Sequence, residues 1–279
     1  MNKRFLTLDL LTQFKEYLLL EEKSTATIEK YYRDVCAFFD FAENREITKE
    51  LVMEYKRTLL NMEYKPRSIN SMLASINSLW GFLRWEDCRV KNIKIQQAVY
   101  CAEEQELTKK DYLKLVEAAK KKPRLCLLLQ TICGTGIRVS ELSYFTVEAV
   151  THGEIIVSCK NKTRTILLPA KLRKMLLNFC KKNGIKEGVI FRTKTGKSMD
   201  RSNIWRELKK LCRETNVNLQ KVFPHNLRKL FARTFYSIEK DIAKLADILG
   251  HSSINTTRIY IMTTCMEHRR KIEKLGLVV

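Results

Sequence analysis

The sequence predicts a mainly α-helical protein with small β-hairpins, divided into two domains. Only 9 glycines and 4 prolines interrupt the 279 residues, which favours helices over many short strands. Hydrophobic residues make up 45% of the chain, enough to build a core. Charge is distributed unevenly: residues 1–100 hold 16 Lys+Arg and 14 Asp+Glu, against 36 and 17 in residues 101–279. This asymmetry indicates two domains with different roles.

The net charge of +21 indicates a polyanionic partner, either nucleic acid or an anionic membrane surface. No apolar run reaches the ~18 residues needed to cross a bilayer. Asp9 and Lys15 interrupt the N-terminal apolar run, which argues against a signal peptide. The nine cysteines form no CxxC pair and the four histidines lack zinc-ligand spacing. We therefore expect a cytoplasmic protein with reduced thiols and neither a disulfide framework nor structural zinc.

The first domain is predicted over residues 1–86 as four amphipathic helices. Thr7, Ser24 and Thr48 are candidate N-caps, and Pro66 suits a first helical turn. Apolar residues at helical spacing define the buried stripes, which run through Leu10–Leu18, Ile28–Phe39, Leu51–Leu59 and Ile69–Leu83.

The basic side of this domain lies around its fourth helix. Residues 56–100 hold 8 basic and 3 acidic residues, whereas residues 1–55 hold 8 and 11. If the domain binds DNA, we expect Lys65, Arg67 and Arg84 to make contacts. A solvated basic face without a ligand is the alternative.

A polar linker is predicted over residues 87–105, followed by a second domain over residues 106–279. Thr108 is a candidate N-cap there. The β-branched runs 154–158 and 164–168 predict a hairpin, and residues 189–198 predict a second short strand pair. Helices are predicted over 109–121, 124–133, 170–182, 202–213, 225–237, 239–249 and 253–260, with another beginning near Val139.

Four separated segments of the second domain carry candidate chemistry. They are Arg138 in GTGIRVSEL, the HNLR segment from His225 to Arg228, the LGH segment ending at His251, and Tyr260 in HSSINTTRIY. In this order the motifs resemble the tyrosine recombinases of the phage integrase family, which read TGxRxSEL, a lysine-tipped hairpin, HxLRH and LGHxxxxTTxxY. The resemblance covers essentially the whole chain.

The resemblance implies an N-terminal SAM-like helical core-binding domain and a C-terminal α+β catalytic domain. It is strongest to Xer-type recombinases and mobile-element integrases. It implies strand exchange on duplex DNA through a 3′-phosphotyrosyl intermediate, without a metal or a cofactor. It also implies a cytoplasmic, nucleoid-associated protein that makes no membrane contact.

Elementary chemistry agrees with the arginines of these motifs. Two guanidiniums can clamp the nonbridging oxygens of a phosphodiester, and Arg138 and Arg228 are the candidates. A simple ion pair with Glu141, three residues further on, is the alternative for Arg138. His225 lies three residues before Arg228, so both address one face of a helix.

The remaining catalytic candidates follow from the motif positions. Tyr260 is the candidate nucleophile, and His225 can take its proton. His251 follows Gly250, which suits a helix C-cap, and the resemblance implies a supporting hydrogen bond from His251 to the phosphate.

The family's hairpin lysine protonates the leaving 5′-oxygen. The corresponding segment reads Ser-Cys-Lys-Asn-Lys-Thr-Arg over 158–164, so that lysine is Lys160 or, as the alternative, Lys162. Lys162 and Arg164 are also candidate DNA contacts. Lys229 and Ile261 stand where the family often has histidine.

The resemblance implies a homotetramer on two DNA sites with inverted-repeat core sites, together with accessory DNA-bending or excision factors. A C-terminal tail from about residue 262 would dock on a neighbouring protomer, and a disordered basic tail is the alternative. We expect integration or excision of a mobile element. The alternatives are Xer-type dimer resolution, type IB topoisomerase-like cleavage and rejoining, a hairpin-forming resolvase and a catalytically inactive DNA-binding protein.

Overall fold

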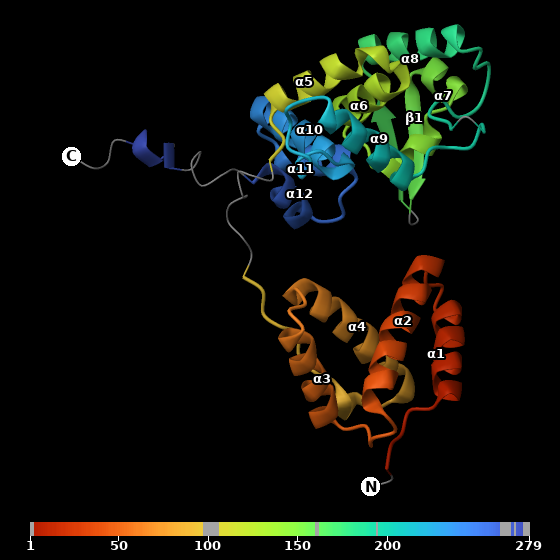
Figure 1. Cartoon of the computed structure of the whole chain (residues 1–279), viewed down its shortest axis with the longest axis vertical. Coiled ribbons are helices and arrows are strands. Elements are labelled where there is room, and N and C mark those ends of the chain that lie inside the picture. The colour runs from red at the N-terminus through yellow and green to blue at the C-terminus, as the bar shows by residue number, and fades with distance from the viewer. Residues whose placement is uncertain are drawn as a thin grey trace. The chain divides into compact units, whose positions relative to one another are not determined.

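The computed structural model describes residues 3–96, 106–159, 162–193, 195–262, 269–270 and 272–275. The chain divides into two compact units, Met1–Gln97 and Ala98–Val279, and each has its own hydrophobic core. Figure 1 shows that both units are mainly helical, with one strand pair in the second. The predicted fold class is confirmed.

The described residues of unit 1 form four α-helices and a short 3-10 helix. Thr7 and Thr48 cap two of the helices through their side chains, as predicted. Ser24 is also an N-cap, but its hydroxyl bonds the Thr27 hydroxyl at 2.8 Å rather than a backbone amide. The elements are α1 (Leu8–Leu20), α2 (Thr25–Ala42), α3 (Lys49–Asn61), α4 (Pro66–Leu83) and the 3-10 helix Glu86–Cys88.

The core of unit 1 combines aliphatic side chains with buried aromatic rings. Phe38 of α2 meets Trp80 of α4 edge to face, with ring centroids 5.7 Å apart, and Tyr55 of α3 at 5.2 Å. Such pairs stabilise packing beyond the area that they bury. Through Phe38 they join α2 to both α3 and α4, and predicted DNA contacts lie at the two ends of α4.

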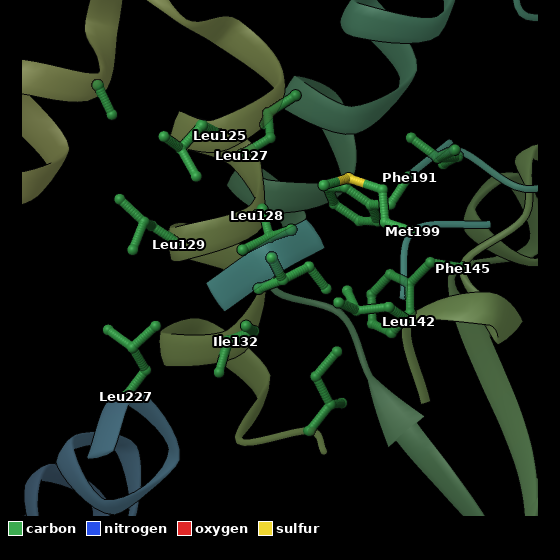
Figure 2. Packing of buried hydrophobic residues seen from close by; sticks show 14 of the residues in the cluster. Leu125, Leu127, Leu128, Leu129, Ile132, Leu142, Phe145, Phe191, Met199 and Leu227 are labelled. Atoms are coloured by element: carbon green, nitrogen blue, oxygen red, sulfur yellow. The ribbon is translucent and has the colours of Figure 1, made fainter. Parts of the chain in front are cut away.

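Unit 2 is built around α6, whose leucines fill its core together with side chains from α10 and from the loops (Figure 2). A capping box between Thr108 and Asp111 starts α5. The elements are α5 (Lys109–Ala118), the 3-10 helix Ala119–Lys121, α6 (Pro123–Thr135), the 3-10 helix η4 (Val139–Tyr144), α7 (Val147–His152), β1 (Glu154–Cys159), β2 (Lys162–Leu167), α8 (Ala170–Lys182), α9 (Arg201–Arg213), α10 (Pro224–Glu239), α11 (Ile242–Leu249) and α12 (Ile254–Ile261).

The predicted hairpin is present as an antiparallel pair, β1 with β2. Pairing continues to Cys159 opposite Lys162, so both strands reach further toward the tip than the β-branched runs indicated. Ile155, Val157 and Ile166 point into the core, and this alternation fixes the register.

Two predicted segments differ in the structure. Within the described part of residues 189–198, the expected strand pair is reduced to an isolated bridge between Arg192 and Ser198. The helix expected from residue 239 begins at Ile242 instead. Lys240 ends α10 in the left-handed conformation, at φ 59°, and the Asp241 side chain caps α11; both features favour a break between the helices.

Candidate active site

Unit 2 brings five of the six predicted catalytic residues into one cluster. Arg138 lies at the start of η4, His225 and Arg228 in the first turns of α10, His251 just after α11, and Tyr260 in α12. The sixth, Lys160, lies outside the described residues. These segments are far apart in sequence, so the cluster exists only because the helices pack.

Arg228 is the centre of the cluster and is only 2% exposed. One terminal nitrogen, Nη1, donates to the Gly136 carbonyl at 2.6 Å, and the other, Nη2, donates to the Leu249 carbonyl at 2.6 Å. Its Nε is buried without a hydrogen-bond partner among the described residues. Burial, followed by the charge of Arg138, lowers the pKa of Arg228 to about 10. The guanidinium is therefore a cation held rigidly by two backbone carbonyls.

Glu141 holds the cluster's arginines together, a role that its place in the sequence did not indicate. Its carboxylate is buried and accepts from Arg138 Nη1 at 3.0 Å, from the Arg138 backbone amide at 2.7 Å and from Arg164 Nη2 at 2.6 Å. Arg228 Nη1 lies 4.0 Å from the same carboxylate. The sequence signal was the spacing of Glu141 from Arg138, which suggested only a local pair.

The Arg138 side chain links η4 to the end of α11 through hydrogen bonds. Besides its bonds with Glu141, its Nη2 donates to the Gly250 carbonyl at 3.0 Å. The side chain is 38% exposed and lines an open pocket of about 570 Å³ together with His225, Arg228 and, from α9, Arg201 and Trp205. Arg138 therefore makes the ion pair with Glu141 and also reaches the pocket, so the two roles considered for it are compatible.

Tyr260 is nearly buried, at 8% exposure. Its hydroxyl lies 3.3 Å from His225 Nδ1, within hydrogen-bonding distance, and the Arg228 guanidinium lies 5.7 Å from its ring centroid. Burial, followed by the charges of Lys229, Arg228 and Arg201, lowers the pKa of His225. A neutral imidazole beside the phenol can accept its proton.

His251 lies between Arg228 and α12. Its Nε2 is 3.0 Å from Arg228 Nη2, and its Nδ1 is 2.9 Å from the Thr257 hydroxyl. Burial, followed by the charges of Arg228, Arg138 and Arg164, lowers the pKa of His251 to about 4. His251 is therefore neutral near pH 7.

The predicted DNA contacts lie in different places. Arg164 is inside the cluster, with one terminal nitrogen donating to Glu141 and the other to the Ile248 carbonyl. The backbone of Lys162 pairs with Cys159, and its side chain is outside the described part. Lys65 and Arg67 lie exposed at the start of α4 and Arg84 at its end, about 27 Å apart along an 18-residue helix.

The part of the chain that the structure describes contains no group of three or more His, Cys, Asp or Glu side chains arranged to hold a metal ion. Within that part, no helix is both long and apolar enough to cross a membrane. The pocket presents the side chains of Arg138, Arg201, Arg228 and His225, and His225 in turn contacts the Tyr260 phenol. This donor set suits an oxyanion held close to a nucleophile.

The helical fold, the buried arginine centre and the adjacent tyrosine define a class of protein, the phage integrases. The sequence matches the Phage integrase family over residues 105–265 and the N-terminal SAM-like domain of phage integrases over residues 11–87. The chain belongs to the Phage integrase family, and the resemblance inferred from its motifs is confirmed.

Individual relatives agree with this assignment. The chain is 29% identical to tyrosine recombinase XerA of Pyrococcus furiosus, over 100% of this chain and 98% of the relative. A crystal structure of XerA recombinase superposes with a TM-score of 0.55 at 25% identity, over 97% of this chain and 99% of that one. A lambda integrase tetramer bound to a Holliday junction shares the fold, with a TM-score of 0.73 at 17% identity, over 93% and 78%.

Proposed function

We propose that this protein is a site-specific DNA recombinase that cuts and rejoins duplex DNA through a 3′-phosphotyrosyl intermediate. The observation that carries the proposal is the juxtaposition of the Tyr260 hydroxyl, 3.3 Å from His225 Nδ1, with the buried Arg228 guanidinium beneath the same ring. A candidate nucleophile and a proton acceptor thus lie within hydrogen-bonding distance of each other and next to a fixed cation, and His225 and Arg228 also line the open pocket.

In the proposed reaction, the Tyr260 oxygen attacks the scissile phosphorus and its proton passes to His225. The bond from phosphorus to the 5′-oxygen breaks, and that oxygen leaves as a hydroxyl after taking a proton. A 5′-hydroxyl of the partner duplex then attacks the phosphotyrosine, which restores the phenol and a phosphodiester. The number of phosphodiester bonds is conserved, so the cycle needs neither ATP nor, in our proposal, a metal or cofactor.

Arg138 and Arg228 stabilise the charge that develops on the nonbridging oxygens. Arg228 is held by two carbonyls, so its guanidinium is fixed in place before a phosphate arrives. Removing one such donor typically costs about 10²–10³-fold in rate. We assign protonation of the leaving 5′-oxygen to Lys160, with Lys162 as the alternative.

The proposal is tested with the variant Tyr260→Phe. This variant loses only the hydroxyl, so we expect it to bind its site with unchanged affinity and to form no covalent adduct with a nicked suicide duplex. The measurement is a denaturing gel of protein–DNA products. An adduct formed by Tyr260→Phe at the wild-type rate would refute the assignment of the nucleophile.

We further propose that four protomers assemble on two duplexes with inverted-repeat core sites, as in the lambda integrase tetramer bound to a Holliday junction. Lys65, Arg67 and Arg84 would contact DNA from unit 1, and accessory DNA-bending or excision factors would assist. The tail from about residue 262 would dock on a neighbouring protomer; most of its residues lie outside the described part.

For the biological role we propose integration and excision of a mobile element. Similarity to XerA over the full chain favours a second candidate, Xer-type dimer resolution. A reporter with two identical sites in direct repeat separates the two roles. Efficient resolution of the repeat, without recombination between two different sites, would favour the second candidate. Relaxation of a supercoiled plasmid carrying one site, without exchange between two, would instead indicate topoisomerase-like activity.

A further inference from the structure

Three buried or half-buried side chains form a hydrogen-bonded chain behind the candidate phosphate site. Arg228 Nη2 lies 3.0 Å from His251 Nε2, and His251 Nδ1 lies 2.9 Å from the Thr257 hydroxyl oxygen. Thr257 is fully buried, and Arg228 is 2% exposed. Both ring nitrogens of His251 are therefore engaged by protein groups.

The donor chemistry of arginine fixes where the proton of His251 lies. A guanidinium has five donors and no acceptor, so His251 Nε2 must accept from Arg228. A neutral imidazole carries one N–H, which must then be on Nδ1. Nδ1–H donates to the Thr257 oxygen. A second proton on Nε2 would make that nitrogen a donor as well, and it would then face the Arg228 N–H group with no acceptor between them.

The local backbone holds the ring in this position. Gly250 ends α11 in the left-handed conformation, at φ 62°, and the His251 amide donates to the Ala246 carbonyl at 2.9 Å. The Ser253 hydroxyl caps α12, which places Thr257 one turn into the helix. His251 is thus fixed by α11 through its backbone and by α12 through its ring.

We infer that Thr257 is a positioning residue that sets the proton of His251 on Nδ1, and through it holds the Arg228 guanidinium in place. The inference rests on the proposed function for its consequence in catalysis. It gives His251 a role that differs from the expected one, since Nε2 accepts from Arg228 and has no proton to donate to a phosphate oxygen. Without the Thr257 oxygen, the Nδ1–H is buried without an acceptor, which favours moving the proton to Nε2 at the expense of the hydrogen bond from Arg228.

The first test measures the tautomer directly in the full-length protein. Histidine-selective ¹⁵N labelling and long-range proton–nitrogen spectra report which ring nitrogen is protonated, and His251→Gln assigns the signal among four histidines. We expect Nδ1–H in the wild type and in Thr257→Ser, and a shift toward Nε2–H in Thr257→Val. An Nε2–H tautomer in the wild type would overturn the inference without reference to any activity.

The second test measures the consequence for the chemical step. In single-turnover cleavage of a suicide duplex, we expect Thr257→Val to be about tenfold slower, the order expected when one hydrogen bond is removed. DNA affinity should be unchanged, and Thr257→Ser should lie within about twofold of the wild type. Thr256→Val, at an exposed position on the same helix, is the matched control and should behave as the wild type.

The outcomes separate the two proposals. If the tautomer shifts as expected but the wild type forms no adduct with any substrate, the proposed function fails and the assignment of the proton stands. If Thr257→Val shifts the tautomer but cleaves at the wild-type rate, Thr257 has no positioning role. If Thr257→Val does not fold, Thr257→Ala, which also removes the hydroxyl, takes its place in both measurements, and an unchanged tautomer and cleavage rate in that variant would overturn the inference.

Discussion

At the scale of single residues, a buried carboxylate organises the site. Glu141 accepts hydrogen bonds from Arg138 and Arg164 and lies 4.0 Å from Arg228. Three guanidiniums this close repel one another, and a single anion among them offsets the repulsion. A phosphate would approach from the pocket side, where Arg138 remains partly exposed.

Removing this carboxylate should destabilise unit 2. Glu141→Ala leaves buried arginines without their anion, so we expect a loss of about 3–5 kcal/mol in the free energy of unfolding, measured by urea denaturation. Glu117→Ala is the control, because Glu117 pairs with Lys120 on the exposed surface and should change stability by less than about 1 kcal/mol. Equal effects of the two substitutions would contradict the central role of Glu141.

The depressed pKa of His251 predicts a pH dependence of stability. Its pKa falls from the ordinary 6.5 to about 4 on folding, because of burial and then the charges of Arg228, Arg138 and Arg164, with His225 adding a smaller effect. The unfolded chain therefore binds more protons between these values, so this contribution to stability is complete above about pH 6.5 and is lost as pH falls toward 4.

His251→Gln stays neutral at every pH and should lose less melting temperature than the wild type between pH 7 and pH 5. Thermal unfolding at both pH values measures this difference. His152→Gln, at an exposed position in α7, is the control and should retain the wild-type loss. If His251→Gln lost as much melting temperature as the wild type between pH 7 and pH 5, groups other than His251 would determine the stability at low pH.

At the scale of elements, tight turns at the ends of helices position the residues of the candidate site. Gly136 ends α6 at φ 63°, two residues before Arg138, and its carbonyl receives Arg228. Gly250 ends α11 immediately before His251, and a Cβ there would lie 2.6 Å from the Arg164 side chain. Only glycine combines the left-handed conformation with these close approaches.

Gly136→Ala should be more damaging than the same change at another left-handed glycine. A Cβ at Gly136 would lie 2.3 Å from the Phe231 ring, whereas Gly184, also at φ 63°, has nothing within 4 Å. Both variants share the backbone strain, so their difference isolates the clash with α10, which we expect to cost about 1–3 kcal/mol more. Urea denaturation of both variants measures this difference in unfolding free energy. Equal midpoints would show that the Phe231 side chain on α10 moves aside without a loss of stability.

Secondary structure was predictable because it depends on local patterns. Thr7, Thr48, Thr108 and Pro66 mark helix starts as expected. The strand pair expected at 189–198 is reduced to the bridge between Arg192 and Ser198, while Val189 bridges Thr146 instead.

At the scale of the whole molecule, some of the positive charge is neutralised inside the protein and some remains exposed at the surface. Arg138, Arg164 and Arg228 surround one carboxylate, so part of the charge in residues 101–279 is used inside the protein. Lys65 and Arg67 are exposed and remain available to a polyanion.

Binding of duplex DNA should therefore depend steeply on salt through the exposed cations. The double variant Lys65→Ala, Arg67→Ala should reduce the slope of log affinity against log salt by about 0.9 for each DNA phosphate that the variant no longer neutralises. Fluorescence anisotropy from 50 to 200 mM salt measures the slope. Lys49→Ala, an exposed lysine of the acidic half of unit 1, is the control. An unchanged slope in the double variant would remove Lys65 and Arg67 from the interface.

The sequence by itself determined the helices, the hairpin, the family and the identity of the candidate catalytic residues, because periodicity, caps and motif order are local properties of the chain. Only the tertiary structure decided what those residues contact. It placed Arg164 against Glu141 rather than at the surface, and it set His251 between Arg228 and Thr257. These partners come from different helices and strands, and packing of the core alone brings them within hydrogen-bonding distance.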